Sequence, residues 1–178
     1  ESDLIEEISQ RMSQLNKIPA ELMLNYQVHA CTDVTGFGLL GHLREMTKAS
    51  ECDIEINFER LPFIRETKNM ATAGVIPGGS FNNLEYVKED IDFGKYGRTD
   101  QLLLCDAQTS GGLLVALPQK DAAAYLNDLH SAGIIDAKII GNFIAKGKGK
   151  IIYLVDNPLY RSFWENGKLF FANAIFLN

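Results

Sequence analysis

The sequence has few of the residues that mark specialised architectures. It has three cysteines in 178 residues, and Cys31, Cys52 and Cys105 lie too far apart to form a C-x-x-C metal site. An odd, widely spaced set argues against a disulfide framework and fits a reducing cytoplasm. Each cysteine lies in an apolar stretch, where this residue is usually a small buried hydrophobe, so we predict that none of them is a nucleophile.

Positive charge and long apolar runs are also scarce. The 17 Lys and Arg residues are outnumbered by 23 Asp and Glu residues, which gives a formal net charge of -6. An acidic domain without a basic stripe is a poor match to nucleic acid or to an anionic membrane. No apolar run reaches the ~20 residues that span a bilayer, and the acidic segment from Glu1 to Glu7 lacks the basic region of a signal peptide. Since the chain starts without Met, we expect it to be part of a longer protein.

The residues that are present describe a globular domain, with 46% hydrophobic and 22% charged residues. Apolar spacing predicts helices over 3–15, 19–26, 38–50, 62–73 and 120–132. Strands are predicted over 28–31, 53–58, 113–117, 138–145 and 150–155. The alternating Lys and Gly residues of 146–150 are typical of a hairpin turn. This order of elements predicts an α+β sandwich, in which helices cover a mixed sheet.

The first candidate loop follows the predicted strand 28–31. Thr32–His42 reads T-D-V-T-G-F-G-L-L-G-H, in which Gly36, Gly38 and Gly41 fit the G-x-G-x-x-G pattern of dinucleotide-binding domains. A Rossmann-type NAD-binding domain is therefore one hypothesis. Against it, four residues separate the strand from the first glycine, and the Asp33 carboxylate would repel a bare pyrophosphate.

A divalent cation reverses the argument about Asp33. A carboxylate is a hard oxygen ligand for Mg²⁺, and the metal would hold a phosphate that the carboxylate alone repels. The glycines would let backbone N–H groups approach the anion at the start of a helix. Taken alone, these residues favour helix capping and turn formation over metal–phosphate binding by about two to one.

The second candidate loop resembles the first in kind. Asp106–Leu114 reads D-A-Q-T-S-G-G-L-L, with an acid, hydroxyls and glycines between apolar elements. Together the segments are specific, because His29–His42 closely resembles the signature of selenophosphate synthetases. Val75–Gly79 resembles the V-P-G-G element of that family, and Asp106–Leu114 resembles its D-P-Q-T-S-G-G-L-L element. Ala107 replaces a proline, which costs stiffness but no chemical group.

This resemblance, which covers about 15–154, implies a domain organisation. Residues 1–155 would form the C-terminal domain of an aminoimidazole ribonucleotide synthetase-like protein, and the N-terminal ATP-binding catalytic domain would be missing. The aromatic segment 156–178 matches nothing in the family. We expect it to pack against the core, and the alternative is a non-catalytic interaction module in which this tail docks a partner.

The resemblance also implies a reaction. The family makes selenophosphate from selenide, ATP and water, with release of AMP and phosphate, and its full-length members form homodimers. Its C-terminal domain supplies no catalytic group but contributes one aspartate, here Asp33, to the Mg²⁺ ions on ATP, with K⁺ as a further cation. Loop residues expected near the phosphates are Thr32, Thr35, Gly36 and Gly38. Weaker candidates are Asp106, Gln108, Thr109 and His42.

Overall fold

A computed structural model describes residues 2–144 and 149–153 of the chain. The hairpin turn predicted at 146–150 lies largely outside the described residues, and the aromatic segment 156–178 lies wholly outside them. The helices are α1 (Ser2–Ser13), α2 (Lys17–Met23), α3 (Gly38–Ser50), α4 (Thr67–Thr72), α5 (Gly78–Val87), α6 (Arg98–Leu104) and α7 (Gln119–Ser131), with the short 3-10 helices η1 (Phe58–Arg60) and η2 (Lys88–Asp90). The strands are β1 (Ala30–Asp33), β2 (Ile54–Ile56), β3 (Leu113–Pro118), β4 (Lys138–Phe143) and β5 (Gly149–Tyr153).

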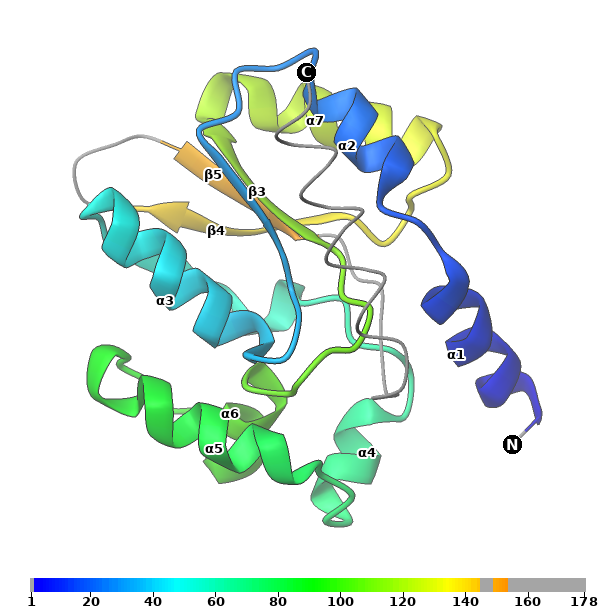
Figure 1. The fold of residues 1–178 in the computed structure, drawn as a ribbon, viewed down its shortest axis with the longest axis vertical. Helices are drawn as coiled ribbons and strands as arrows, with labels where there is room; N and C mark the ends of the chain where they lie inside the picture. The colour runs from blue at the N-terminus through cyan, green and yellow to red at the C-terminus, as the bar shows by residue number, and fades with distance from the viewer. Residues whose placement is uncertain (1, 145–148, 154–178) are drawn as a thin grey trace.

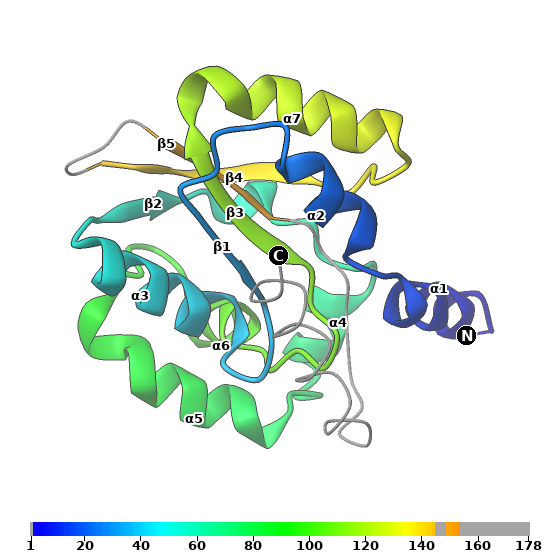
Figure 2. The ribbon, with the colours of Figure 1, turned by 45° about the horizontal axis from the view of Figure 1, so that its top comes forward.

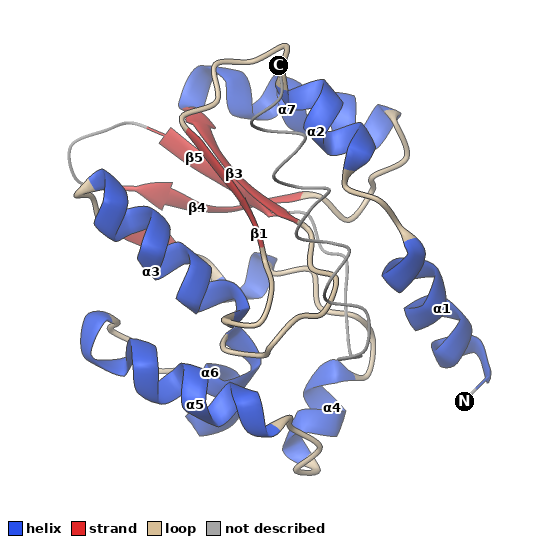
Figure 3. Ribbon diagram, viewed as in Figure 1, coloured by secondary structure: helices blue, strands red, loops and turns tan. Residues whose placement is uncertain are grey.

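The five strands form one sheet in the order β1-β3-β5-β4-β2. Figures 1 and 3 show the sheet among its helices, and Figure 2 labels all of its strands. The α+β prediction is confirmed, but the mixed sheet is wrong, because every strand pair in the described residues is antiparallel. α7 joins β3 to β4, which run in the same direction, but β5 lies between them and pairs with both. β5 therefore separates β3 from β4, the two strands that could have paired in parallel. The Rossmann hypothesis is also wrong, since that fold requires a mostly parallel sheet.

Helices cover both faces of the sheet, with α3, α5 and α6 on one side and α2 and α7 on the other (Figure 2). β3 serves both faces, because successive side chains of a strand point to opposite sides. Leu113, Val115 and Leu117 pack in the cluster under α2 and α7, whereas Leu114 and Ala116 pack in the cluster under α3. This double burial explains why β3 is an uninterrupted apolar run rather than an alternating one.

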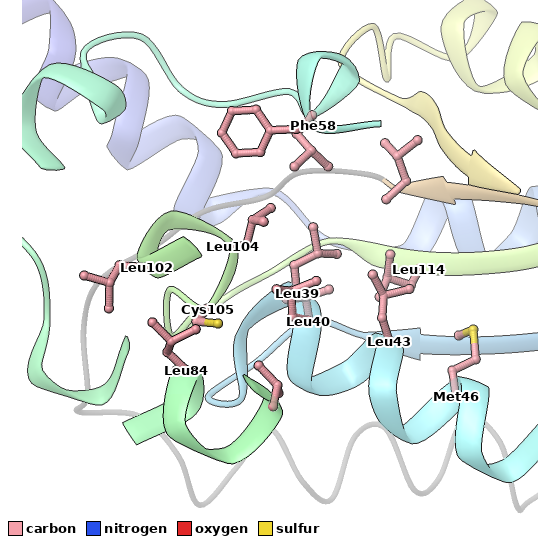
Figure 4. Close-up of a cluster of buried hydrophobic side chains, with 14 of the residues drawn as sticks. Leu39, Leu40, Leu43, Met46, Phe58, Leu84, Leu102, Leu104, Cys105 and Leu114 are labelled. Atoms are coloured by element: carbon pink, nitrogen blue, oxygen red, sulfur yellow. The ribbon is translucent and has the colours of Figure 1, made fainter. Parts of the chain in front are cut away.

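The larger cluster fixes α3 and α5 beneath the sheet (Figure 4). Leu43 of α3, Leu84 of α5 and Leu114 of β3 are each at most 2% exposed. Complete burial of such a side chain stabilises the fold by about 1.5–3 kcal/mol. The elements that carry the candidate loops are therefore held firmly in the core.

Two boundaries differ from the sequence prediction near the loops. β1 covers Ala30–Asp33 instead of 28–31, because its pairing with β3 runs from Ala30 opposite Ala116 to Asp33 opposite Leu113. Asp33 is therefore the last residue of a strand rather than part of a loop. The second difference is the helix α4, which begins at Thr67 rather than at 62.

The glycines also behave in more than one way. Gly74 and Gly133, which follow the ends of α4 and α7, adopt positive φ angles of 85° and 89°. Gly78 and Gly79 form the first turn of α5. Pro77 has extended φ and ψ angles as the N-cap residue, and the helix begins directly after it.

α1 lies at the side of the molecule, beyond the sheet and its covering helices (Figure 1). Two ion pairs attach it, from Arg11 to Asp136 and from Glu7 to Arg65. No helix in the described part of the chain is long and apolar enough to cross a membrane.

Candidate functional site

The two candidate loops lie against each other because they follow and precede neighbouring strands. Asp33 ends β1 directly opposite Leu113, which begins β3. Beyond this pair, the Val34 N–H donates to the Gly112 carbonyl at 3.0 Å, and the Gln108 N–H donates to the Thr35 carbonyl at 3.0 Å. The two candidate loops are thus joined to each other by backbone hydrogen bonds.

Two glycines make this close approach possible. A Cβ atom on Gly111 would lie 1.9 Å from the Val34 carbonyl oxygen, and one on Gly38 would lie 2.6 Å from the Cys105 carbonyl carbon. Gly38 also adopts a φ of 68°, which side-chain-bearing residues rarely tolerate. Gly36 differs from both, because a Cβ atom there would meet nothing within 4 Å.

The start of α3 is not capped by the residues before it. The N-cap residue is Phe37, whose side chain makes no capping hydrogen bond. The interpretation of Asp33 or Thr35 as an N-cap is therefore wrong. Backbone N–H groups of the first turn of a 13-residue helix, with the accompanying dipole, remain suited to an anion.

Asp33 sits half-buried at the end of β1. Within the described residues its carboxylate has no hydrogen bond or ion pair, whereas its carbonyl accepts a hydrogen bond from the Thr32 hydroxyl at 3.2 Å. No group of three or more His, Cys, Asp and Glu side chains that could hold a metal gathers in 2–144 or 149–153. The carboxylate oxygens of Asp33 suit a hard cation. Within the described residues, however, Asp33 would be the only carboxylate ligand at this position.

Asp33 lines neither of two hollows that the described residues form. The large cleft of about 770 Å³ lies between α3, β2 and residues 90–96, and Asp33 does not line it. A small cavity of about 50 Å³ adjoins the second loop at Asp106 and Gln108 and is otherwise walled mainly by apolar side chains.

His42 holds the first loop from within α3. Its Nε2 accepts a hydrogen bond from the Thr35 N–H at 2.9 Å and lies 3.1 Å from the Thr35 hydroxyl. The Phe37 ring meets the imidazole edge-on at 5.9 Å between centroids. Burial lowers the pKa of His42, and nearby Asp33 and Glu45 oppose that shift. A neutral ring is required, because a protonated Nε2 could not accept the Thr35 N–H.

This contact predicts a pH dependence of stability. Because the pKa of His42 is lower in the folded chain than in the unfolded chain, its contribution is present above the unfolded pKa of about 6.5 and is lost as the pH falls below it. We expect His42→Gln, whose amide oxygen can accept the same bond, to reduce the fall in unfolding free energy between about pH 7 and pH 5. Urea titrations at both pH values measure it. His29→Gln, which removes an exposed imidazole, is the control, and an equal change in both variants would contradict the prediction.

The second loop is held by its own polar side chains. Asp106 accepts hydrogen bonds from the Ser80 hydroxyl at 3.0 Å and from the Gln108 amide at 3.2 Å. Burial raises the pKa of Asp106, and these two hydrogen bonds oppose the rise. Asp106 and Gln108 thus fix the loop, and Thr109 is half-buried beside them. Within the described residues, the hydrogen bonds of the Asp106 and Gln108 side chains link them to Ser80 and to each other rather than to Asp33.

Sequence reasoning missed two residues of α5. Ser80 and Asn83 are buried polar side chains on a helix face that otherwise carries Leu84 and Val87. The Asn83 amide donates to the carbonyls of both Gly36 and Cys105, at 2.8 and 3.0 Å. The available signal was the position of these two polar residues within an apolar i, i+3, i+4, i+7 stripe.

Burial suppresses the reactivity of two of the three cysteines. None of the three described cysteines forms a disulfide. Burial is the main cause that raises the pKa of Cys31 and of Cys105 to about 12, so little thiolate exists at neutral pH. The structure therefore supports the expectation that these two are not nucleophiles.

Comparison with known proteins supplies the family. The chain matches the family described as AIR synthase related protein, C-terminal domain, over residues 3–154. It is 40% identical over 153 residues to the selenide, water dikinase of Aliarcobacter butzleri, a match that covers 85% of this chain and 44% of that protein. The enzyme of the same name from Clostridioides difficile is 40% identical over 155 residues, covering 86% of this chain and 44% of the relative. That from Clostridium botulinum is 42% identical over 149 residues, covering 83% and 43%.

The chain spans less than half the length of these curated relatives. Within that span, the match includes both candidate loops and α5 between them. The resemblance drawn from the loop motifs is confirmed: the chain belongs to the family of AIR synthase related protein C-terminal domains and is similar to the selenide, water dikinases.

Proposed function

We propose that this chain is the C-terminal half of a cytoplasmic selenide, water dikinase, which forms selenophosphate from selenide, ATP and water and releases AMP and phosphate. An N-terminal half would supply the ATP-binding and reactive groups, and the complete enzyme would be a homodimer. The main observation is that the two loops are hydrogen-bonded to each other. The Asp33 carboxylate, which has no hydrogen bond or ion pair within the described residues, lies in the same segment as the glycines that precede α3. Similarity to dikinases over less than half their length supports the assignment to one half.

Asp33 would be the one Mg²⁺ ligand that this half provides. The charge and hardness of a carboxylate suit a small divalent cation. Bound there, Mg²⁺ would neutralise phosphate charge and hold the polyphosphate for in-line transfer. A single ligand is insufficient for tight binding, so carboxylates from another domain would have to complete the metal site. Closure of the two halves would then depend on nucleotide and metal together.

The glycine loop would approach the phosphates through its backbone. Within the described residues, Gly36 is exposed with open space on its Cβ side, and the N-cap residue of α3 makes no side-chain capping hydrogen bond. Both features favour an anion near Thr35, Gly36 and Gly38. Thr32, which pairs with Leu114 in the sheet, would act by fixing the end of β1.

The test compares the chain alone with the assembled enzyme, meaning this chain preceded by an N-terminal half. We expect the isolated chain to form no AMP from ATP above background, because it carries one metal ligand and no reactive group. The assembled enzyme should form AMP in a selenide- and Mg²⁺-dependent manner, measured by chromatography of the nucleotides. Selenide-dependent AMP formation by the chain alone, or none by the assembled enzyme, would contradict the proposal.

A further inference from the structure

The side chain of Asn83 connects the two loops from below. It is 8% exposed, and it lies on α5 between the buried residues Ser80 and Leu84. One of its amide hydrogen bonds goes to Gly36, three residues after Asp33, and the other goes to Cys105, directly before Asp106. A primary amide is suited to this role, because its nitrogen carries two N–H donors that can serve two acceptors at once.

The helix that carries Asn83 is firmly placed. Leu84 is 1% exposed and Val87 is not exposed at all, and both belong to the large core cluster. One turn before Asn83, Ser80 donates to the Asp106 carboxylate. α5 therefore presents two polar contacts at i and i+3 to the loops, from a backbone that the core holds still.

The hydrogen bond from Asn83 restrains the Gly36 loop, which we propose to approach the phosphates. Gly36 is exposed and has open space where a side chain would be, so its conformation depends on hydrogen bonds rather than on packing. Glycine has the largest conformational freedom of any residue, and an untethered glycine loop populates many arrangements. The Asn83 bond to the Gly36 carbonyl restricts that freedom at the point where backbone N–H groups would meet an anion.

We propose that Asn83 is a positioning residue for nucleotide and metal binding: by bonding both loops, it keeps the Gly36 segment and Asp33 in the arrangement that accepts a metal-bound polyphosphate. This inference rests on the proposed function. Loss of Asn83 would lower the fraction of molecules whose loops are arranged to bind the ligand. The apparent affinity for the ligand would fall in proportion to that fraction.

Enzyme kinetics distinguish a positioning role of Asn83 from a purely structural role. If Asn83 sets the competent fraction, its loss raises the KM for ATP and the Mg²⁺ concentration at half-maximal rate. Saturating ligand then restores the competent arrangement, so kcat changes little. If Asn83 only supports the fold, its loss lowers the amount of active enzyme and hence the apparent kcat, while the KM of the molecules that remain folded is unchanged.

The experiment uses the assembled enzyme with Asn83→Asp and Asn83→Ser. Asp preserves shape but cannot donate to the two carbonyls, and the smaller Ser leaves room for water to take over part of the bonding. Asn82→Asp and Asn82→Ser are the matched controls, because Asn82 is the exposed neighbour on the same helix. We expect a KM for ATP and a Mg²⁺ requirement about tenfold higher in the Asn83 variants, with kcat within about threefold of the parent. The Asn82 variants should stay within about twofold on every parameter.

A lowered kcat with unchanged KM, or no change in either, overturns the proposal. A second measurement needs no variant and covers the case in which both Asn83 variants fail to fold. In the parent enzyme, ATP with Mg²⁺ should slow hydrogen exchange at the Val34 and Gln108 amides together, since both amides join the loops. Slowing at only one amide, or at neither, counts against the coupling. Failure of the proposed function is recognised separately, as the absence of selenide-dependent AMP formation in the parent enzyme.

Discussion

Asp33→Asn in the assembled enzyme is expected to lower selenide-dependent AMP formation by about 1000-fold while the domain remains folded. The amide keeps the size of the carboxylate but removes its negative charge, so the attraction to a divalent cation is largely lost. The fold should survive, because in the described residues this carboxylate has no hydrogen bond or ion pair to lose. Initial rates at saturating ATP and Mg²⁺, with thermal unfolding of the same samples, measure both parts.

The control for this variant is Asp53→Asn. Asp53 is an exposed carboxylate just before β2, so the same chemical change is made away from the loops. We expect its rate to stay within about twofold of the parent. A normal rate for Asp33→Asn would remove Asp33 from the metal site. A large loss of thermal stability in Asp33→Asn would instead show that the carboxylate serves the fold.

The sequence predicts an element of the fold well where a local pattern of apolar residues determines that element. The helix predicted at 38–50 is α3 (Gly38–Ser50) in the structure, because Leu39, Leu43 and Met46 form an unmistakable helical stripe that the core buries. The direction of strand pairing was not predictable in this way. It depends on β5 entering the sheet between β3 and β4, which is a property of the whole chain rather than of a local segment.

The candidate site was only partly visible in the sequence. The two loops could be named from their acids, hydroxyls and glycines, but their junction depends on the register that places Asp33 opposite Leu113. The partners of Asn83 are backbone carbonyls, which every residue has and which therefore leave no trace in the sequence. The sequence also predicts no helix with defined bounds between 73 and 120, so the first turn of α5, which carries Ser80, was not foreseen.

The glycines illustrate the same limit. Gly36 and Gly111 are indistinguishable as loop glycines in the sequence, yet one borders open space and the other touches a neighbouring backbone. Gly111 marks the junction between the two loops, whereas Gly36 marks the surface that we propose to contact the phosphates. This difference can be tested by the same substitution at both positions.

Gly111→Ala is expected to destabilise the chain by about 3 kcal/mol or more. The added Cβ atom would lie 1.9 Å from the Val34 carbonyl oxygen and 2.8 Å from its carbonyl carbon. Both are backbone atoms of Val34, a fully buried residue directly after β1, so no flexible side chain can move aside. Relief requires the loops to separate, which breaks the bond from the Val34 N–H to the Gly112 carbonyl. Urea unfolding of the chain measures the loss.

Gly36→Ala is the matched control, because its new methyl group meets no atom within 4 Å and its φ is not positive. Its unfolding free energy should stay within about 1 kcal/mol of the parent, because the added methyl group creates no clash and alanine restricts the unfolded chain. In the assembled enzyme, however, a methyl group on the open side of Gly36 would obstruct the approach of a phosphate, so the KM for ATP should rise. Equal stability of the two alanine variants would show that the loops are not locked together at Gly111. An unchanged KM in Gly36→Ala would show that the polyphosphate does not approach the loop at Gly36.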